Sequence, residues 1–183
     1  VGSREDCLEA ARAGNVFVAR DQAFRFRRGE GLSAVVVKTE NAEGDHEAFV
    51  AEGMTGGDLL RFSRQFRLPD GRVAEGSFRL AFAADLRAPD FFAFSCERVN
   101  PLPADRGALL VHDNGATGLS RIVLAEDNPS DFQYLMETVL DQRAITAHSF
   151  GLSIEAANAT VEVLTPAGLS AHYGVTNASQ ERG

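Results

Sequence analysis

The side chains of this chain that could do chemistry do not form any local catalytic motif. Four histidines occur, and no two of them have the HxH or HxxxH spacing that brings two imidazoles to one metal ion. The serines lack the GxSxG context of a nucleophile elbow, and the glycines at 53, 56 and 57 lack the Lys-Ser/Thr of a phosphate-binding loop. Cys7 and Cys96 do not have the spacing of a metal knuckle or redox pair, so we expect buried or half-buried thiols. Any site must therefore be assembled by the fold.

The composition argues against two classes of partner. The chain has 18 Lys and Arg against 26 Asp and Glu, a formal net charge of -8, and no basic patch. We therefore expect no nucleic acid as a partner. No apolar run approaches the roughly 18 residues of a membrane helix, so no membrane is expected either. The first residues show no basic segment followed by an apolar one, so we expect no secretory signal and a cytoplasmic location.

Two segments of the chain repeat each other. GLSAVVV at residues 31–37 and GLSRIVL at residues 118–124 share glycine, leucine, serine, one variable residue and three aliphatic residues in the same order. Such self-similarity indicates a repeated unit, and two copies are too few for a solenoid. The 183 residues therefore suit two related half-units sharing a core.

Each copy of the repeat opens the same succession of predicted elements. In the first half we expect a strand at 32–38, a helix at 45–52 and strands at 59–67, 72–83 and 91–99. In the second half we expect a strand at 119–124, a helix capped by Asn128 with Pro129 in its first position, and strands at 144–150, 152–156 and 160–164. A last short helix is expected at 166–173. Both halves therefore read β–α–β–β–β.

The residues before the first repeat predict two helices. Ser3 and Asp6 have the spacing of a capping box, which indicates a short first helix that ends near Gly14. Residues 16–28 fit two patterns, because Phe17 and Phe24 have helical spacing while Phe24 and Phe26 alternate with arginines as in a strand. We favour the helix, ended by the glycines at 29 and 31.

The chain resembles the vicinal oxygen chelate superfamily, whose unit is a βαβββ module and whose paired modules form a cupped sheet around one site. The resemblance rests on GLSRIVLAEDNPSDFQYLMETVL (residues 118–140), ATVEVLTPAGLSAHYG (159–174) and LPDGRVAEGSFRLAF (68–82), which are similar to segments of its glyoxalase-like members. It implies an α+β fold of two βαβββ modules forming a cupped mixed sheet. The expected boundaries are a helical lead at 1–29, modules at 30–100 and 118–175, a linker at 101–117 and a flexible tail at 176–183.

Enzymes of this superfamily hold a divalent metal through His, Glu or Gln side chains on the first and last strands of each module. The resemblance places those positions at Ala34 and Arg121 on the first strands, and near Phe94 and at Glu162 on the last. Only Glu162 is of a ligating type, and a single carboxylate beside an arginine binds no transition metal tightly. We therefore expect no metal and no cofactor. Three alternatives then remain for these two residues. They form a partly buried ion pair, or Arg121 offers a fork to a carboxylate or phosphate ligand, or both side chains point elsewhere.

His112 and Asn114 complete the candidate site residues. They lie in HDNG, directly before the second module, and this segment suits a simple turn. In the functional interpretation, His112 is a titratable group at the mouth of the cup and Asn114 is a hydrogen-bond donor.

We expect a glyoxalase-like protein that binds or transforms a small metabolite in the cup between the modules. If Arg121 offers its guanidinium to the ligand, that metabolite is anionic. The alternative is a metal-dependent lyase, isomerase or dioxygenase of the same superfamily, with Glu162 joined by histidines from loops or a second subunit. Sheet edges of such modules often pair across chains, so we expect a homodimer.

Overall fold

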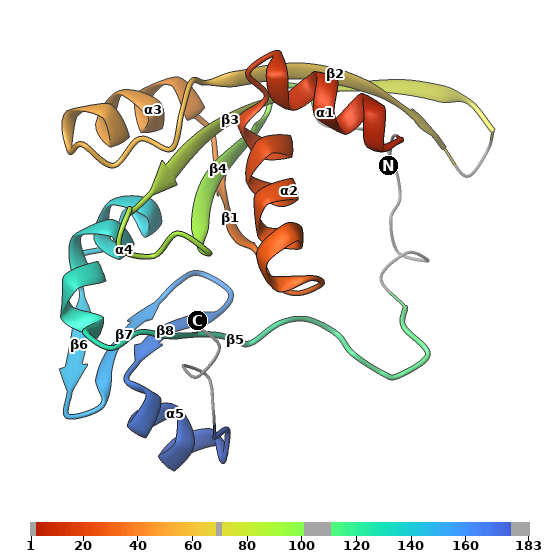
Figure 1. Cartoon of the computed structure of the whole chain (residues 1–183). Helices are drawn as coiled ribbons and strands as arrows, with labels where there is room; N and C mark the ends of the chain where they lie inside the picture. Colours follow the sequence, from red (N-terminus) through yellow and green to blue (C-terminus); the bar gives the residue numbers. More distant parts are fainter. Residues whose placement is uncertain (1–2, 69–70, 101–110, 177–183) are drawn as a thin grey trace. The chain divides into compact units, whose positions relative to one another are not determined.

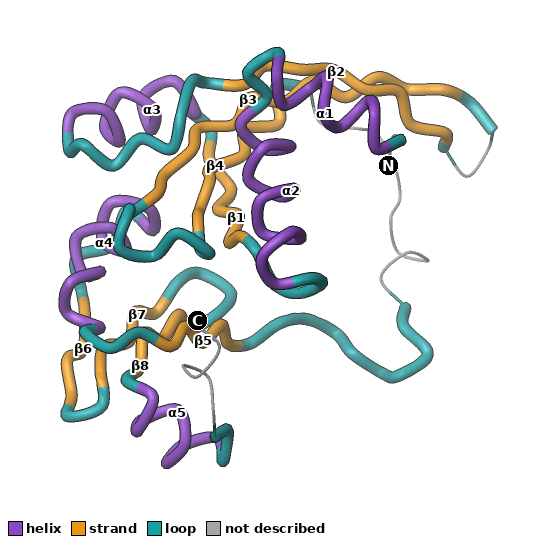
Figure 2. The backbone as a smooth tube through the Cα atoms, in the orientation of Figure 1, coloured by secondary structure: helices purple, strands orange, loops and turns teal. Residues whose placement is uncertain are grey.

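The computed structural model describes residues 3–68, 71–100 and 111–176 and divides the chain into two units, Val1–Ala104 and Asp105–Gly183. Each unit contains one four-stranded sheet with its helices, as Figure 1 shows, and Figure 2 shows the same backbone by secondary structure. The described part of the predicted linker, residues 111–117, contains neither helix nor strand. The predicted tail lies outside the described residues from position 177 onward.

The first unit contains the predicted β–α–β–β–β module, preceded by two helices. Its elements are α1 (Arg4–Arg12), α2 (Val16–Arg28), β1 (Ala34–Thr39), α3 (Ala42–Ala51), β2 (Leu60–Arg67), β3 (Val73–Ala84) and β4 (Phe92–Arg98). The strand order is β1-β4-β3-β2, and only β1 and β4 run parallel.

Local signals set the ends of most of these helices. The Ser3–Asp6 capping box is present at α1, and Asn15 caps α2, so the helix expected at 16–28 is confirmed. The prediction for α3 was too short, because the helix begins at Ala42. The Asn41 side chain accepts a hydrogen bond from the Gly44 amide at 3.1 Å and so starts the helix three residues early.

The first sheet is covered on both faces. One face carries a cluster of buried side chains, Leu80, Phe82, Phe92 and Phe94, against which Val16 of α2 packs. On the other face, α3 packs against β3 and β4. Apolar packing therefore holds both helices to this sheet.

The second unit repeats the module. Its elements are β5 (Arg121–Ala125), a 3₁₀ turn η2 (Pro129–Phe132), α4 (Gln133–Leu140), β6 (Ile145–His148), β7 (Gly151–Glu155), β8 (Thr160–Leu164) and α5 (Pro166–Tyr173). The strand order β5-β8-β7-β6, with β5 and β8 parallel, is that of the first unit. The predicted α+β fold of two βαβββ modules is therefore confirmed.

One detail of the second module differs from the prediction. Asn128 makes no side-chain capping hydrogen bond, and Pro129 opens the 3₁₀ turn rather than an α-helix. The α-helix begins at Gln133. Proline fixes its own backbone and suits the first turn of either kind of helix, and Phe132, the last residue of the 3₁₀ turn, is buried in the core.

The two faces of the second sheet differ in character. Leu152, Ile154, Val161 and Val163 are buried on one face, and the η2 turn packs against β7 and β8 there. Side chains alternate along a strand, so Glu162 lies on the opposite face. No helix in the described ranges is long and apolar enough to cross a membrane.

Gly151→Ala should lower the free energy of unfolding by more than about 2 kcal/mol. Gly151 has φ of +148°, and a Cβ there would overlap the carbonyl oxygen of Val163 in the neighbouring strand. Gly118→Ala is the matched control, because its Cβ would meet nothing within 4 Å. Urea denaturation measures both, and equal stability of the two variants would contradict this account of the β7–β8 approach.

Candidate functional site

The pairing of β5 with β8 brings Arg121 and Glu162 to the same face of the second sheet. Arg121 is in register with Thr160, and Val123 is in register with Glu162. The two side chains therefore project to one side, two residues apart along the strands. Arg121 Nη1 lies 3.0 Å from Glu162 Oε1 and donates a hydrogen bond to it. The ion pair expected from the sequence is present.

Tyr173 completes this network, and sequence reasoning missed it. Its hydroxyl accepts a hydrogen bond from Arg121 Nη1 at 3.0 Å and donates one to Glu162 Oε2 at 2.5 Å. Tyr173 is the last residue of α5, whose first turn is capped by Thr165. The available signal was the predicted helix directly after the Glu162 strand, which can fold back over that strand.

The network compensates a buried charge. Glu162 is only 7% exposed, and burial of a carboxylate is costly unless the group is paired and hydrogen-bonded. Each of its oxygens accepts one bond, from Arg121 and from Tyr173. The hydrogen bond to Tyr173, followed by the charge of Glu162, raises the pKa of the Arg121 guanidinium, which therefore stays charged.

Arg121 is held at one end only. Its Nη1 makes both hydrogen bonds, while its side chain is 49% exposed. Within residues 3–68, 71–100 and 111–176, no acceptor is found for its Nε or Nη2. A guanidinium fixed on one nitrogen presents the other edge for a bidentate contact with a carboxylate or phosphate.

His112 and Asn114 are not drawn into this network. Both are exposed and lie around a turn in which Gly115 donates to the His112 carbonyl at 2.9 Å and Ala116 donates to Asn114 Oδ1 at 3.0 Å. Among the described residues, no hydrogen bond or ion pair joins either side chain to Arg121 or Glu162. Their part in a binding site stays a prediction.

The four positions at which the superfamily holds a metal do not fit one in this chain. Phe94 is in register with Val36 as Glu162 is with Val123, which confirms that Phe94 and Glu162 are equivalent. Phe94 is buried and packs edge-on against Phe17 of α2, with ring centroids 5.7 Å apart. Neither Phe94 nor Ala34 offers a donor atom, and both oxygens of Glu162 are already engaged. In the described parts of the chain, no group of three or more His, Cys, Asp and Glu residues is placed to hold a metal ion.

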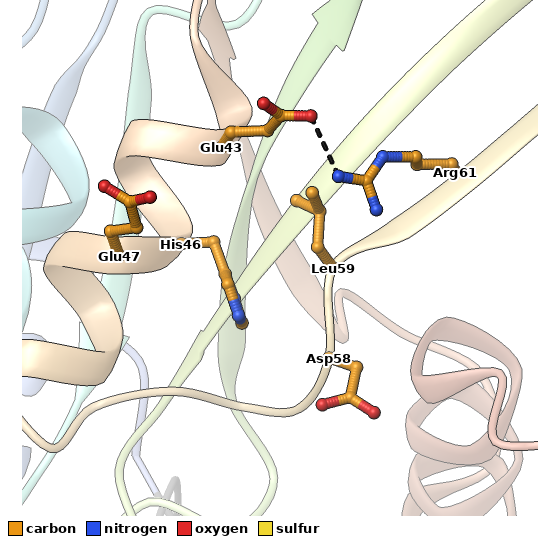
Figure 3. Close-up of a pocket in the computed structure, with 6 residues that line it drawn as sticks. All are labelled: Glu43, His46, Glu47, Asp58, Leu59 and Arg61. Carbon is orange, nitrogen blue, oxygen red and sulfur yellow. Dashed lines mark hydrogen bonds and ion pairs between the residues drawn. The ribbon is translucent and has the colours of Figure 1, made fainter.

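A hollow of about 370 Å³ lies beside α3 in the first unit. Figure 3 shows its lining residues, Glu43, His46, Glu47, Asp58, Leu59 and Arg61. Glu43 and Arg61 form an ion pair at 2.8 Å across it. Sequence reasoning did not single out these residues, because they come together only through the packing of α3 on β3 and β4.

Comparison with known proteins identifies the family. A family model described as a glyoxalase-like domain matches residues 3–140, and the chain belongs to that family. This confirms the resemblance found in the sequence, although the match ends before β6, so Glu162 and Tyr173 lie beyond it.

A solved structure shows the same fold. The crystal structure of a hypothetical protein from Staphylococcus aureus superposes with a TM-score of 0.61 at 11% sequence identity, covering 90% of this chain and 66% of that one. At this identity the likeness concerns the fold alone. No curated protein matches the chain.

Tyr173→Phe should lower the free energy of unfolding by about 1.5–3 kcal/mol, because it removes a hydrogen bond to a buried carboxylate. Tyr134→Phe is the control, since Tyr134 is 69% exposed and its hydroxyl has no hydrogen-bond partner among the described residues. Thermal or urea unfolding of the two variants gives the comparison.

In the same assay Arg121→Met should also lower the free energy of unfolding, and adding Glu162→Gln to it should restore much of that free energy. If Arg121→Met is as stable as the wild type, Arg121 does not compensate the buried charge of Glu162.

Proposed function

We propose that the second unit binds a small metabolite carrying a carboxylate or phosphate group, with Arg121 as the anion-binding side chain and without a metal at the superfamily positions. The observation that carries the proposal is the fixed but half-exposed guanidinium. Glu162 and Tyr173 orient it through Nη1, and the Nε–Nη2 edge remains for a ligand. Because that edge is oriented before binding, little side-chain entropy is lost when a ligand arrives.

Membership in the glyoxalase-like family supports a small-molecule ligand, since the superfamily fold resembled by the sequence surrounds a small-molecule site.

The negative charges near Arg121 limit how much negative charge the ligand can carry. Glu162 already neutralises Arg121, and Glu155 adds a second negative charge near it. A ligand with one anionic group is therefore favoured over one with several. The remainder of such a ligand should be neutral, since additional negative charge would face Glu155.

Ligand-observed NMR with a panel of small monocarboxylates and phosphomonoesters tests the proposal. Arg121→Met should weaken binding of any hit about tenfold or more, because it removes a charge-assisted, bidentate contact. Arg143→Met is the matched control: it removes the same charge from the same unit, just before β6 at the opposite edge of the sheet. Equal weakening in both variants, or no hit in the whole panel, would sink the proposal.

We also propose that the chain forms a homodimer. In the described structure, β1 and β2 end the first sheet and β5 and β6 end the second, so each has one paired side within its sheet. Unpaired strand edges favour association with another chain. Light scattering at micromolar concentration should give twice the 19.7 kDa mass of one chain, and a monomer mass would contradict the proposal.

A further inference from the structure

The pairing of β2 with β3 brings two arginines and two serines together on one face of the first sheet. Arg61 is in register with Arg79, and Ser63 is in register with Ser77. Alternation along the strands places all four side chains on the same side. The two hydroxyl oxygens lie 2.8 Å apart in a hydrogen bond. A hollow of about 300 Å³ is lined by these four residues together with Phe62, Phe78 and Val99.

Two like charges directly opposite each other on a sheet are unfavourable unless they are compensated. Glu43 of α3 provides part of the compensation, 2.8 Å from Arg61 Nη2 and 3.8 Å from Arg79 Nε. Figure 3 shows Glu43 reaching toward Arg61. Glu97 of β4 lies 3.2 Å from Arg79 Nη1. The hydrogen bond from Arg61, then the charge of Arg79, holds the pKa of the Glu43 carboxyl below its usual range.

These contacts leave several donors without a partner. Among the described residues, no acceptor is found for Arg61 Nε and Nη1 or for Arg79 Nη2. One hydroxyl proton joins Ser63 and Ser77, so the second hydroxyl proton is available as well. The side chain of Arg61 is 59% exposed and that of Arg79 is 34% exposed, so the donors are accessible from the hollow. They surround one open space from both strands.

We propose that this hollow binds a phosphate group, from inorganic phosphate or from a phosphomonoester, through Arg61, Arg79 and the Ser63–Ser77 pair. A tetrahedral oxyanion has acceptors in several directions, which suits donors arriving from two guanidinium groups and a hydroxyl. A planar carboxylate engages one guanidinium edge and leaves the others unused. The site lies in the first unit and its residues are distinct from the Arg121 network, so the two proposals stand separately.

Titration with inorganic phosphate at constant ionic strength, followed by amide NMR of the whole chain, tests the site. The amides of Ser63 and Ser77 should shift saturably. Arg61→Gln should weaken binding about tenfold or more, and Ser77→Ala should weaken it several-fold without changing the charge. Parallel titration with glycerol phosphate shows which source is preferred, and tighter binding of either one supports the site.

Arg64→Gln is the matched control. Arg64 is on the same strand but on the other face, with its guanidinium 4.3 Å from the centre of the Phe66 ring. It should retain wild-type binding. Glu43→Gln should strengthen binding, because it removes the carboxylate that competes for Arg61. Equal weakening by Arg61→Gln and Arg64→Gln would indicate diffuse surface charge and overturn the proposal, as would the lack of any saturable shift in the wild type.

Discussion

The parallel pairing of the first strand of each module with its last strand is the constraint on which both sheets depend. β1 lies beside β4, and β5 lies beside β8. Parallel neighbours need a long connection, and here the connection contains the helix and the two middle strands of the module. The helical segment therefore covers one face of the sheet, and side chains of the first and last strands lie on the other face. The side chains of those two strands decide what each module can bind.

The two modules use that face in opposite ways. In the first module, Phe94 occupies the position that corresponds to Glu162. Side chains of α2 pack on that face of the first sheet. Burial of large apolar surface stabilises the fold there. In the second module, the position is occupied by the carboxylate of Glu162, whose buried charge must be compensated. Arg121 and Tyr173 compensate it through hydrogen bonds to its two oxygens.

The arginines of the β2–β3 hairpin have a different origin. Arg61 and Arg79 are brought together by antiparallel register, not by a buried partner. Glu43 and Glu97 compensate them from a helix and from the neighbouring strand, all with partly exposed side chains. Exposed pairs of this kind contribute little to stability, so their main consequence is a concentration of directed donors at the surface. Each unit thus carries a partly exposed guanidinium group that is oriented by a carboxylate, although the chain has a net charge of -8.

The sequence by itself determined the local elements, because their signals are local. The repeat of GLS with three aliphatic residues indicated two modules, the capping box placed α1, and the Thr-Pro at 165–166 opened α5 where expected. The resemblance to a known superfamily then placed Arg121 near Glu162, and the register of β5 with β8 agrees. Only the tertiary structure decided which side chains meet across elements. Tyr173 reaches Glu162 because α5 folds back over β8, and Arg61 faces Arg79 because the hairpin closes in one particular register. Strand period and helix caps depend on neighbours in sequence, whereas register and helix docking depend on the packing of the whole unit.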